Sequence, residues 1–162
     1  MQDKFELHLT FIQNVITRMN SNSFQLKGWC ITVFAAILAI YTSTENEYFI
    51  LIAIPTTLIF WILDTYYLLQ ERKFRGLYND IAGLSENPIT TKTFEMNPSV
   101  YTKDVSSKYK YFSVFWSKTI WVLYLSIILF CISLYFYIYL HNEINVCETL
   151  EMVSNLYRIN YA

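Results

Sequence analysis

Glycine and proline are scarce in this chain, which has three of each among its 162 residues. The loops that cradle phosphate in Walker-type and dinucleotide-binding proteins need several closely spaced glycines, and neither fingerprint occurs. The GxSxG and HExxH motifs of hydrolases and zinc proteases are also missing. Because the sequence shows no cluster of histidine, cysteine and carboxylate groups either, we expect that the chain is not an enzyme.

Cysteine and histidine are few and scattered. Cys30, Cys131 and Cys147 lie far apart, and His8 and His141 stand away from any cysteine pair. This spacing fits no metal motif and no disulfide framework. The first apolar run follows a long polar and amphipathic segment, and no small-residue cleavage site follows that run, so no secretory signal peptide is visible. We expect no metal, no cofactor and no cleaved leader.

Long apolar segments are abundant, and 54% of the residues are hydrophobic. Thr119–Leu140 contains no charge, proline or glycine, and about 20 such residues suffice for an α-helix to cross a bilayer. Gly28–Ser43, lengthened by Phe24–Lys27, and Tyr48–Leu69 are two further candidates. The sequence therefore predicts an integral membrane protein with three crossings, the second of which continues as a helix in water to about Leu84.

An amphipathic helix is predicted before the first crossing, over residues 3–24. Its apolar residues follow the 4-3-4-3 spacing of a heptad seam, namely Phe5, Leu9, Ile12, Ile16 and Met19. A helix that lies on a membrane surface usually carries many basic residues, whereas this one balances Lys4 and Arg18 against Asp3 and Glu6. The seam favours packing, either on copies of itself or on the rest of the chain, and predicts an oligomer.

The charges indicate an orientation. Segment 70–118 carries eight basic and five acidic residues, the turn at 44–47 carries two acidic residues only, and the segment from 141 onward carries one basic and three acidic residues. Lysine and arginine prefer the cytoplasmic side of a membrane. We therefore expect the N-terminus and the 70–118 segment inside the cell, with the turn and the C-terminus outside it.

Asp64 is the residue that most needs an explanation, because a carboxylate inside a membrane segment is costly and usually faces a partner or a water path. Lys27 and Arg72 are the candidate partners. One interpretation is a structural aspartate neutralised by one of these cations. The other is a carboxylate that lines or gates a pore.

The densest basic cluster is Arg72, Lys73 and Arg75, and it suits either lipid headgroups or a cytosolic polyanion. Further along, aromatic and basic residues alternate from Tyr101 through Lys103 to Phe112. This pattern suits stacking on a single-stranded nucleic acid and equally an aromatic belt at a membrane surface. Residues 70–112 could therefore hold either a ligand or a protein partner.

The predicted fold is an all-α integral membrane protein that assembles as an oligomeric bundle. The expected segments are a cytosolic amphipathic helix for oligomerisation or gating (1–24), a transmembrane hairpin with a helical extension (25–84), a cytosolic connector (85–117), a third crossing (118–141) and an external tail (142–162).

Two blocks carry a resemblance to known proteins. RMNSNSFQLKGWCITVFAAILA, Arg18 to Ala39, and FWILDTYYLLQERKFRGLY, Phe60 to Tyr78, are similar to the blocks of a family of small three-pass bacterial membrane proteins. Some members resemble the membrane effector of the Hailong anti-phage system, which accompanies a nucleotidyltransferase. The blocks cover about a quarter of the chain, and the connector and tail lie outside them.

The resemblance implies an oligomeric ion-channel effector in the bacterial inner membrane, held shut by its N-terminal helices. A nucleotide or single-stranded oligonucleotide from a nucleotidyltransferase encoded nearby would open it during phage infection, and depolarisation would halt the cell. The resemblance assigns signal binding or gating to a set of polar residues within the two blocks, namely Arg18, Asn22, Lys27, Asp64, Gln70, Glu71, Arg72 and Arg75.

Two rival hypotheses remain. A non-conducting membrane scaffold could recruit a cytosolic partner through residues 70–112. A lipid-modifying enzyme would need a catalytic residue within the membrane, for which Asp64 is the candidate.

Overall fold

The computed structural model describes residues 2–88, 94–102 and 107–160, and within these residues it contains helices and turns but no strand. Three long helices dominate, α1 (Gln2–Thr44), α2 (Tyr48–Ile81) and α4 (Lys118–Asn160). Between α2 and α4 lie two 3₁₀ turns, η1 (Pro98–Thr102) and η2 (Ser107–Tyr109), and the short helix α3 (Tyr111–Phe115). The prediction of an all-α chain is confirmed for the described residues.

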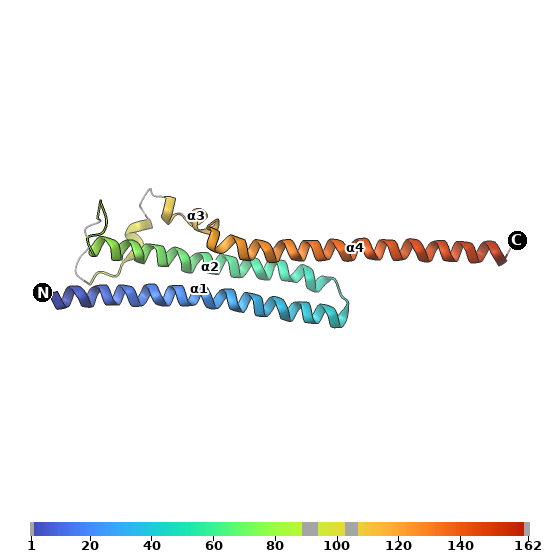
Figure 1. Cartoon of the computed structure of the whole chain (residues 1–162), viewed down its shortest axis with the longest axis horizontal. Coiled ribbons are helices and arrows are strands. Elements are labelled where there is room, and N and C mark those ends of the chain that lie inside the picture. The colour runs from blue at the N-terminus through green and yellow to red at the C-terminus, as the bar shows by residue number, and fades with distance from the viewer. Residues whose placement is uncertain (1, 89–93, 103–106, 161–162) are drawn as a thin grey trace.

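The three long helices lie side by side (Figure 1). A short turn joins α1 and α2 into a hairpin, and α4 runs along α2 and continues well beyond that turn. Each long helix contains a stretch that is long and apolar enough to cross a membrane. The three predicted crossings are therefore matched by three helices of membrane-spanning length.

Two expected boundaries between segments are not breaks in the structure. Helix α1 passes without interruption through the boundary expected at residues 24 and 25, and α4 passes through the one expected at 141 and 142. The physical reason is that hydropathy changes at both places while neither holds a proline or a glycine that would end a helix. A change of solvent along a helix does not terminate it.

Side chains of all three long helices form the core of the apolar region. One buried cluster joins Cys30 of α1 and Trp61 of α2 to Ile120 and Tyr124 of α4. The Trp61 ring stacks on Phe115 with centroids 4.3 Å apart, and its indole N–H donates to the Phe115 carbonyl at 3.2 Å. Trp61 is thus a packing residue, and it anchors α3 to α2.

A second cluster packs the N-terminal half of α1 onto the C-terminal half of α2. It buries Ile12 and Ile16 against Leu77 and Tyr101, so part of the connector closes over the pair of helices. Two members of the predicted heptad seam are therefore covered by the chain itself. Of the other seam residues, Phe5 is exposed and Leu9 and Met19 are half-buried.

Gly76 allows the connector to approach α2 closely. A Cβ atom at this position would lie 2.6 Å from the Tyr109 hydroxyl oxygen and 3.1 Å from Cε1 of Tyr101. Both tyrosine rings rest on α2 where it has no side chain, with their centroids 5.2 Å apart. The connector is therefore a packed part of the molecule over its described residues.

Candidate functional site

Asp64 is the centre of a polar cluster that joins all three long helices. Its side chain is completely buried, and its Oδ2 atom lies 2.6 Å from Nζ of Lys27 on α1. The Ser23 hydroxyl donates to Oδ1, and the Tyr124 hydroxyl of α4 donates to Oδ2 at 3.2 Å. We call these four residues, Ser23, Lys27, Asp64 and Tyr124, the Asp64 cluster.

Within the Asp64 cluster the charges balance. Nζ of Lys27 also donates to Oγ of Ser23 at 2.8 Å, so the serine accepts from the lysine while it donates to the aspartate. Only Lys27 reaches the surface, with 21% of its side chain exposed. A buried carboxylate is tolerated when a cation and hydrogen-bond donors satisfy its oxygens, and here three donors on two neighbouring helices do so.

The sequence accounts for part of this cluster. Ser23 and Lys27 are four residues apart and therefore share one face of α1. Of the two candidate partners for Asp64, Lys27 is the one in contact, whereas Arg72 donates to the Ser117 hydroxyl at 2.8 Å. Of the two candidates that the sequence left open, the structure therefore pairs Asp64 with Lys27. Sequence reasoning missed Ser23, which the four-residue spacing to Lys27 could have flagged, and Tyr124, for which no local signal exists.

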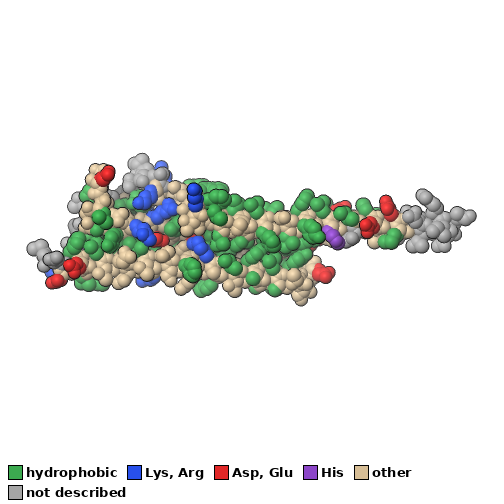
Figure 2. Space-filling model, viewed as in Figure 1, with side chains coloured by type: hydrophobic (Ala, Val, Ile, Leu, Met, Phe, Trp, Pro, Cys, Tyr) green, Lys and Arg blue, Asp and Glu red, His purple; other side chains and the backbone are tan. Residues whose placement is uncertain are grey.

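A basic surface lies two turns further along α2. Arg75 donates through Nε to Glu71 at 2.7 Å and leaves 57% of its side chain exposed, whereas Glu71 and Lys73 are buried. Figure 2 shows lysine and arginine side chains gathered over the region where α2 meets the connector and the start of α4. Exposed Lys108, Lys110 and Lys118 belong to that region of the chain. We call the surface formed by Arg72, Arg75, Lys108, Lys110 and Lys118 the basic face.

Aromatic residues of the connector border the basic face. Nζ of Lys108 lies 5.7 Å from the centre of the Tyr109 ring, and Phe112 is largely exposed. The Tyr101 hydroxyl, by contrast, donates to Asp80 of α2, so this ring is a buried packing element. Of the aromatic and basic residues that alternate in the sequence, Lys103 lies outside the described residues.

The remaining predicted ligand residues are spread along the two helices. Arg18 is exposed on α1, and Gln70 is half-buried on α2. Asn22 is half-buried and lines a hollow of about 140 Å³ together with Gln25, Trp29 and Tyr67. Asn22 and Trp29 belong to the first of the two sequence blocks that carry the family resemblance and Tyr67 to the second, so the two blocks meet here.

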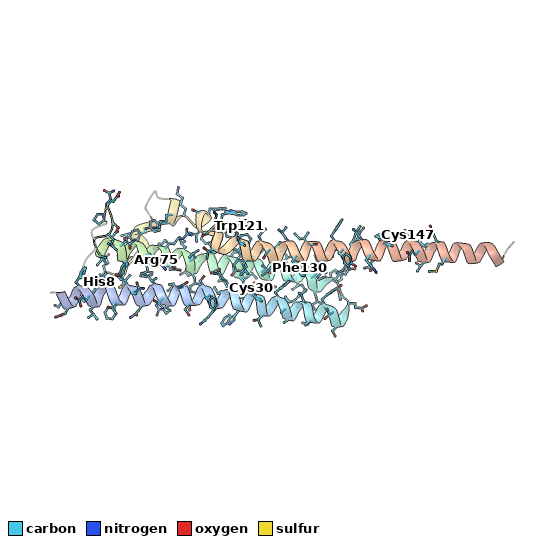
Figure 3. All side chains as sticks on the ribbon, in the orientation of Figure 1. His8, Cys30, Arg75, Trp121, Phe130 and Cys147 are labelled. Carbon is cyan, nitrogen blue, oxygen red and sulfur yellow. The ribbon has the colours of Figure 1, made fainter. Side chains whose placement is uncertain are left out.

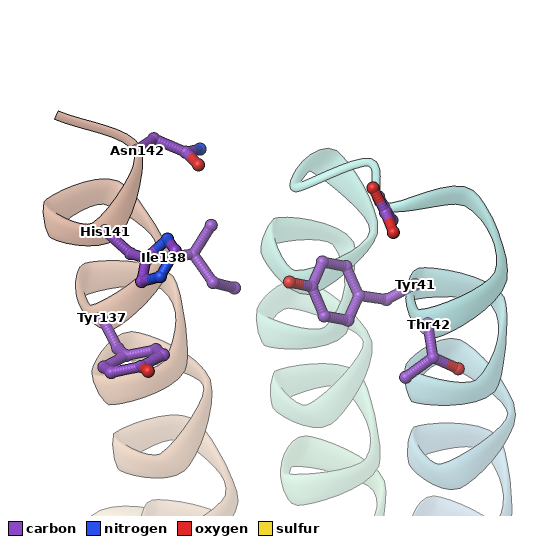
Figure 4. Close-up of a pocket in the computed structure, with 7 residues that line it drawn as sticks. Tyr41, Thr42, Tyr137, Ile138, His141 and Asn142 are labelled. Carbon is purple, nitrogen blue, oxygen red and sulfur yellow. The ribbon is translucent and has the colours of Figure 1, made fainter. Parts of the chain in front are cut away.

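A larger pocket, of about 410 Å³, opens near the hairpin turn, between the C-terminal end of α1 and the middle of α4 (Figure 4). Tyr41 and Thr42 line it from α1, and Tyr137 and His141 from α4. Beside it, the Asn142 amide donates to Glu47 at 3.0 Å, which ties α4 to the hairpin turn. In the described part of the chain, no group of three or more histidine, cysteine or acidic side chains could hold a metal ion.

Comparison with known proteins identified no relative of this chain. The chain matches no protein-family profile, and neither curated proteins nor solved structures gave a significant match.

Proposed function

We propose that this chain is the subunit of an oligomeric ion channel, an effector of bacterial anti-phage defence in the inner membrane. On this proposal the N-terminus and the basic face are cytosolic, and the turn and the C-terminal half of α4 are external. A nucleotide or single-stranded oligonucleotide, made by a nucleotidyltransferase encoded nearby, opens the channel. The resulting depolarisation stops the infected cell.

The observation that carries the proposal is the position of two charged sites on one helix. Asp64 and Arg72 are eight residues apart on α2, which corresponds to about 12 Å along the helix axis. A polyanion that binds the basic face therefore acts on the same rigid element that holds the buried ion pair. A ligand opens a channel only if it binds the open form more tightly than the closed form. On this proposal, α2 links a ligand bound at the basic face to the buried ion pair and so to the form that the channel adopts.

The basic face has the chemistry that a phosphate chain requires. Guanidinium groups bind phosphate oxygens through paired hydrogen bonds, and Arg75 keeps more than half of its side chain exposed to do so. Phe112 of α3 offers an open ring on which a base can stack.

The test is a flux assay on the purified chain in lipid vesicles loaded with a potential-sensitive dye. We expect synthetic single-stranded oligonucleotides to depolarise vesicles that contain the wild-type chain, and expect rising sodium chloride to weaken the response because phosphate contacts are salt-sensitive. The matched control is a chain with Arg75→Gln, in which the response falls. In cells, rapid depolarisation after phage infection that requires the neighbouring gene would support the same proposal.

A non-conducting scaffold is the second candidate, and exposed Phe112 beside exposed Lys110 is the feature that favours it. Exposed aromatic residues are enriched at protein–protein interfaces. The scaffold predicts that the chain retains a cytosolic partner during purification and passes no current with any oligonucleotide. That pair of results would replace the channel proposal.

A further inference from the structure

The pocket of about 410 Å³ near the hairpin turn has no role in the function proposed above, and we call it the turn pocket. Further from the turn, α1 and α4 meet at Phe34 and Phe130, whose rings lie edge to face with centroids 6.0 Å apart. Seven residues further along each helix, or about 10 Å, Tyr41 and Tyr137 line the turn pocket from its two sides. The two helices therefore contact each other below the pocket and leave a space between them beside the turn (Figure 4).

The turn pocket is apolar at its base and polar at its mouth. Ile138, which lines it, packs against a buried cluster formed by Ile50 and Ala53 of α2 and Cys131 of α4. At the turn the lining ends with the exposed carboxylate of Glu45. The pocket can therefore hold a ligand that has a polar end and a hydrocarbon portion.

The charge of the lining determines which polar end fits. Glu45 forms no ion pair with any described residue, and the lining contains no lysine or arginine. A second carboxylate, that of Glu47, accepts a hydrogen bond from Asn142 at the same end of the molecule. A phosphate or carboxylate ligand would meet like charge here and would find no guanidinium or ammonium group to bind it. The turn pocket therefore suits a cation.

The two tyrosines narrow the choice of cation. Tyr137 exposes 66% of its surface, and Tyr41 is half-buried in the opposite wall. The face of a tyrosine ring attracts a cation, and aromatic side chains are the common means by which proteins recognise substituted ammonium groups. A metal ion fits less well, because no group of three or more histidine, cysteine or acidic side chains that could hold one occurs in the described residues. The lining therefore favours an ammonium group.

The place of the turn pocket indicates what carries the ammonium group. The turn joins two helices that are long and apolar enough to cross a membrane, so on the proposed topology the pocket lies at the outer boundary of the bilayer. At this level a ligand meets water on one side and acyl chains on the other. A molecule with an ammonium headgroup and a hydrocarbon tail matches both the polar mouth and the apolar base.

We propose that the turn pocket binds the ammonium group of an amphiphile, with the Glu45 carboxylate and the rings of Tyr41 and Tyr137 around the cation. The bound molecule fills the space between α1 and α4 and so stabilises their arrangement beside the turn. The inference uses the membrane location of the chain and holds whether or not the chain conducts ions.

Thermal unfolding of the purified chain in detergent tests the inference with two lipids that differ in the ammonium group. Phosphatidylethanolamine carries this group, whereas phosphatidylglycerol carries the same phosphate and a neutral glycerol. Because a ligand that binds the folded form stabilises it, we expect phosphatidylethanolamine to raise the unfolding midpoint by several degrees and phosphatidylglycerol to leave it unchanged. Tetramethylammonium chloride, compared with sodium chloride at equal concentration, presents an ammonium group without acyl chains.

Two variants each remove one part of the site. Glu45→Gln removes the charge and keeps the size of the side chain, and Tyr137→Leu removes a ring. Both side chains are exposed, so we expect the variants to unfold near the wild-type temperature without lipid, and either one alone suffices for the test. The matched controls, Glu143→Gln and Tyr139→Leu, make the same changes at exposed positions of α4 outside the lining.

We expect the shift with phosphatidylethanolamine to disappear in the two pocket variants and to persist in the two controls. Equal shifts with the two lipids, or an undiminished shift in the pocket variants, would overturn the inference. So would the absence of any shift in the wild-type chain with phosphatidylethanolamine and with tetramethylammonium.

The soluble cation distinguishes two sources of the ammonium group. A shift with phosphatidylethanolamine alone would assign the turn pocket to a lipid headgroup. A shift with tetramethylammonium that the pocket variants abolish would support a ligand that also reaches the site from solution. Because no step measures ion flux, a chain that fails the flux assay would refute the channel and leave this inference standing.

Discussion

Nζ of Lys27 lies 2.6 Å from Oδ2 of Asp64, and this contact joins the two halves of the hairpin at the depth where all three long helices meet. Asp64 has no exposed surface, so the lysine and two hydroxyl groups take the place of water around it. Such a pair stabilises the fold mainly when both partners are present, because either one alone is an uncompensated charge.

The first prediction concerns this pair. Asp64→Asn preserves the shape of the side chain but leaves Lys27 without its counter-ion, so we expect a loss of stability near the lower end of the about 3–5 kcal/mol typical of a broken buried pair. Partial exposure of Lys27 places the effect at that lower end. The measurement is thermal unfolding in detergent, followed by helical circular dichroism.

The control for this prediction removes both charges together. The double variant Lys27→Met with Asp64→Leu should recover most of the lost stability, because no charge is left without a partner. A double variant as unstable as Asp64→Asn would mean that shape, rather than charge balance, determines the energy of the cluster.

The second prediction compares two glycines. Gly76→Ala places a methyl group against the rings of Tyr101 and Tyr109, so we expect the connector to loosen, with a loss of about 1–3 kcal/mol typical of overpacking. Gly28→Ala is the control, because open space surrounds that position and alanine favours a helix by about 1 kcal/mol over glycine.

Trypsin cleavage after the exposed Lys108 and Lys110 reports on the connector. We expect faster cleavage in Gly76→Ala and wild-type cleavage in Gly28→Ala. If both variants were cleaved at the wild-type rate, the close packing of the tyrosines on α2 would contribute little to the order of the connector.

The third prediction concerns salt and the basic face. Arg75→Gln should weaken binding of single-stranded oligonucleotides to a similar extent for every sequence, because phosphate contacts carry no base preference. Loss of one contact should also lower the slope of log K against log salt concentration by about 0.7, as for single strands. The measurement is fluorescence anisotropy at several salt concentrations.

Lys4→Gln is the matched charge control for the third prediction, because Lys4 is exposed at the far end of α1. Both variants remove one positive charge from the same chain. If they reduced affinity equally, binding would follow net charge alone and the basic face would have no special role.

The fourth prediction concerns two tryptophans. Trp61→Leu removes the stack on Phe115 and the hydrogen bond to its carbonyl, so we expect a loss of about 3 kcal/mol or more, as for large aromatic truncations in cores. Trp29→Leu should change stability by less than about 0.5 kcal/mol, since Trp29 exposes 62% of its surface. Equal effects in thermal unfolding would contradict the packing role of Trp61.

The sequence predicted the elements of this fold better than their contacts. Hydropathy identified three helices of membrane-spanning length, because the bilayer imposes a length that can be counted along the chain. Heptad spacing showed that Ile12 and Ile16 share a face of their helix, but spacing does not say whether another copy or the chain's own α2 covers that face. The same limit applies to the connector, because no periodic pattern in its sequence indicates that Tyr101 and Tyr109 pack on Gly76.

The Asp64 cluster shows the same limit at the level of single residues. A cation near an intramembrane carboxylate could be expected from charge pairing alone, and Lys27 fits that expectation. Tyr124 lies sixty positions from Asp64 in the chain and on a different helix, so its hydroxyl could be placed only by the packing of α4.

Because α1 is one unbroken helix, we expect it to move as a single rigid element. About 38 Å of this helix lies on the N-terminal side of Lys27, where Ile12 and Ile16 pack on α2, and about 26 Å lies on the side of the turn. The N-terminal segment can therefore separate from α2 only if Ile12 and Ile16 are uncovered as well. Any signal that moves this end of α1 must offset the loss of that apolar contact in addition to any strain on the Lys27–Asp64 pair.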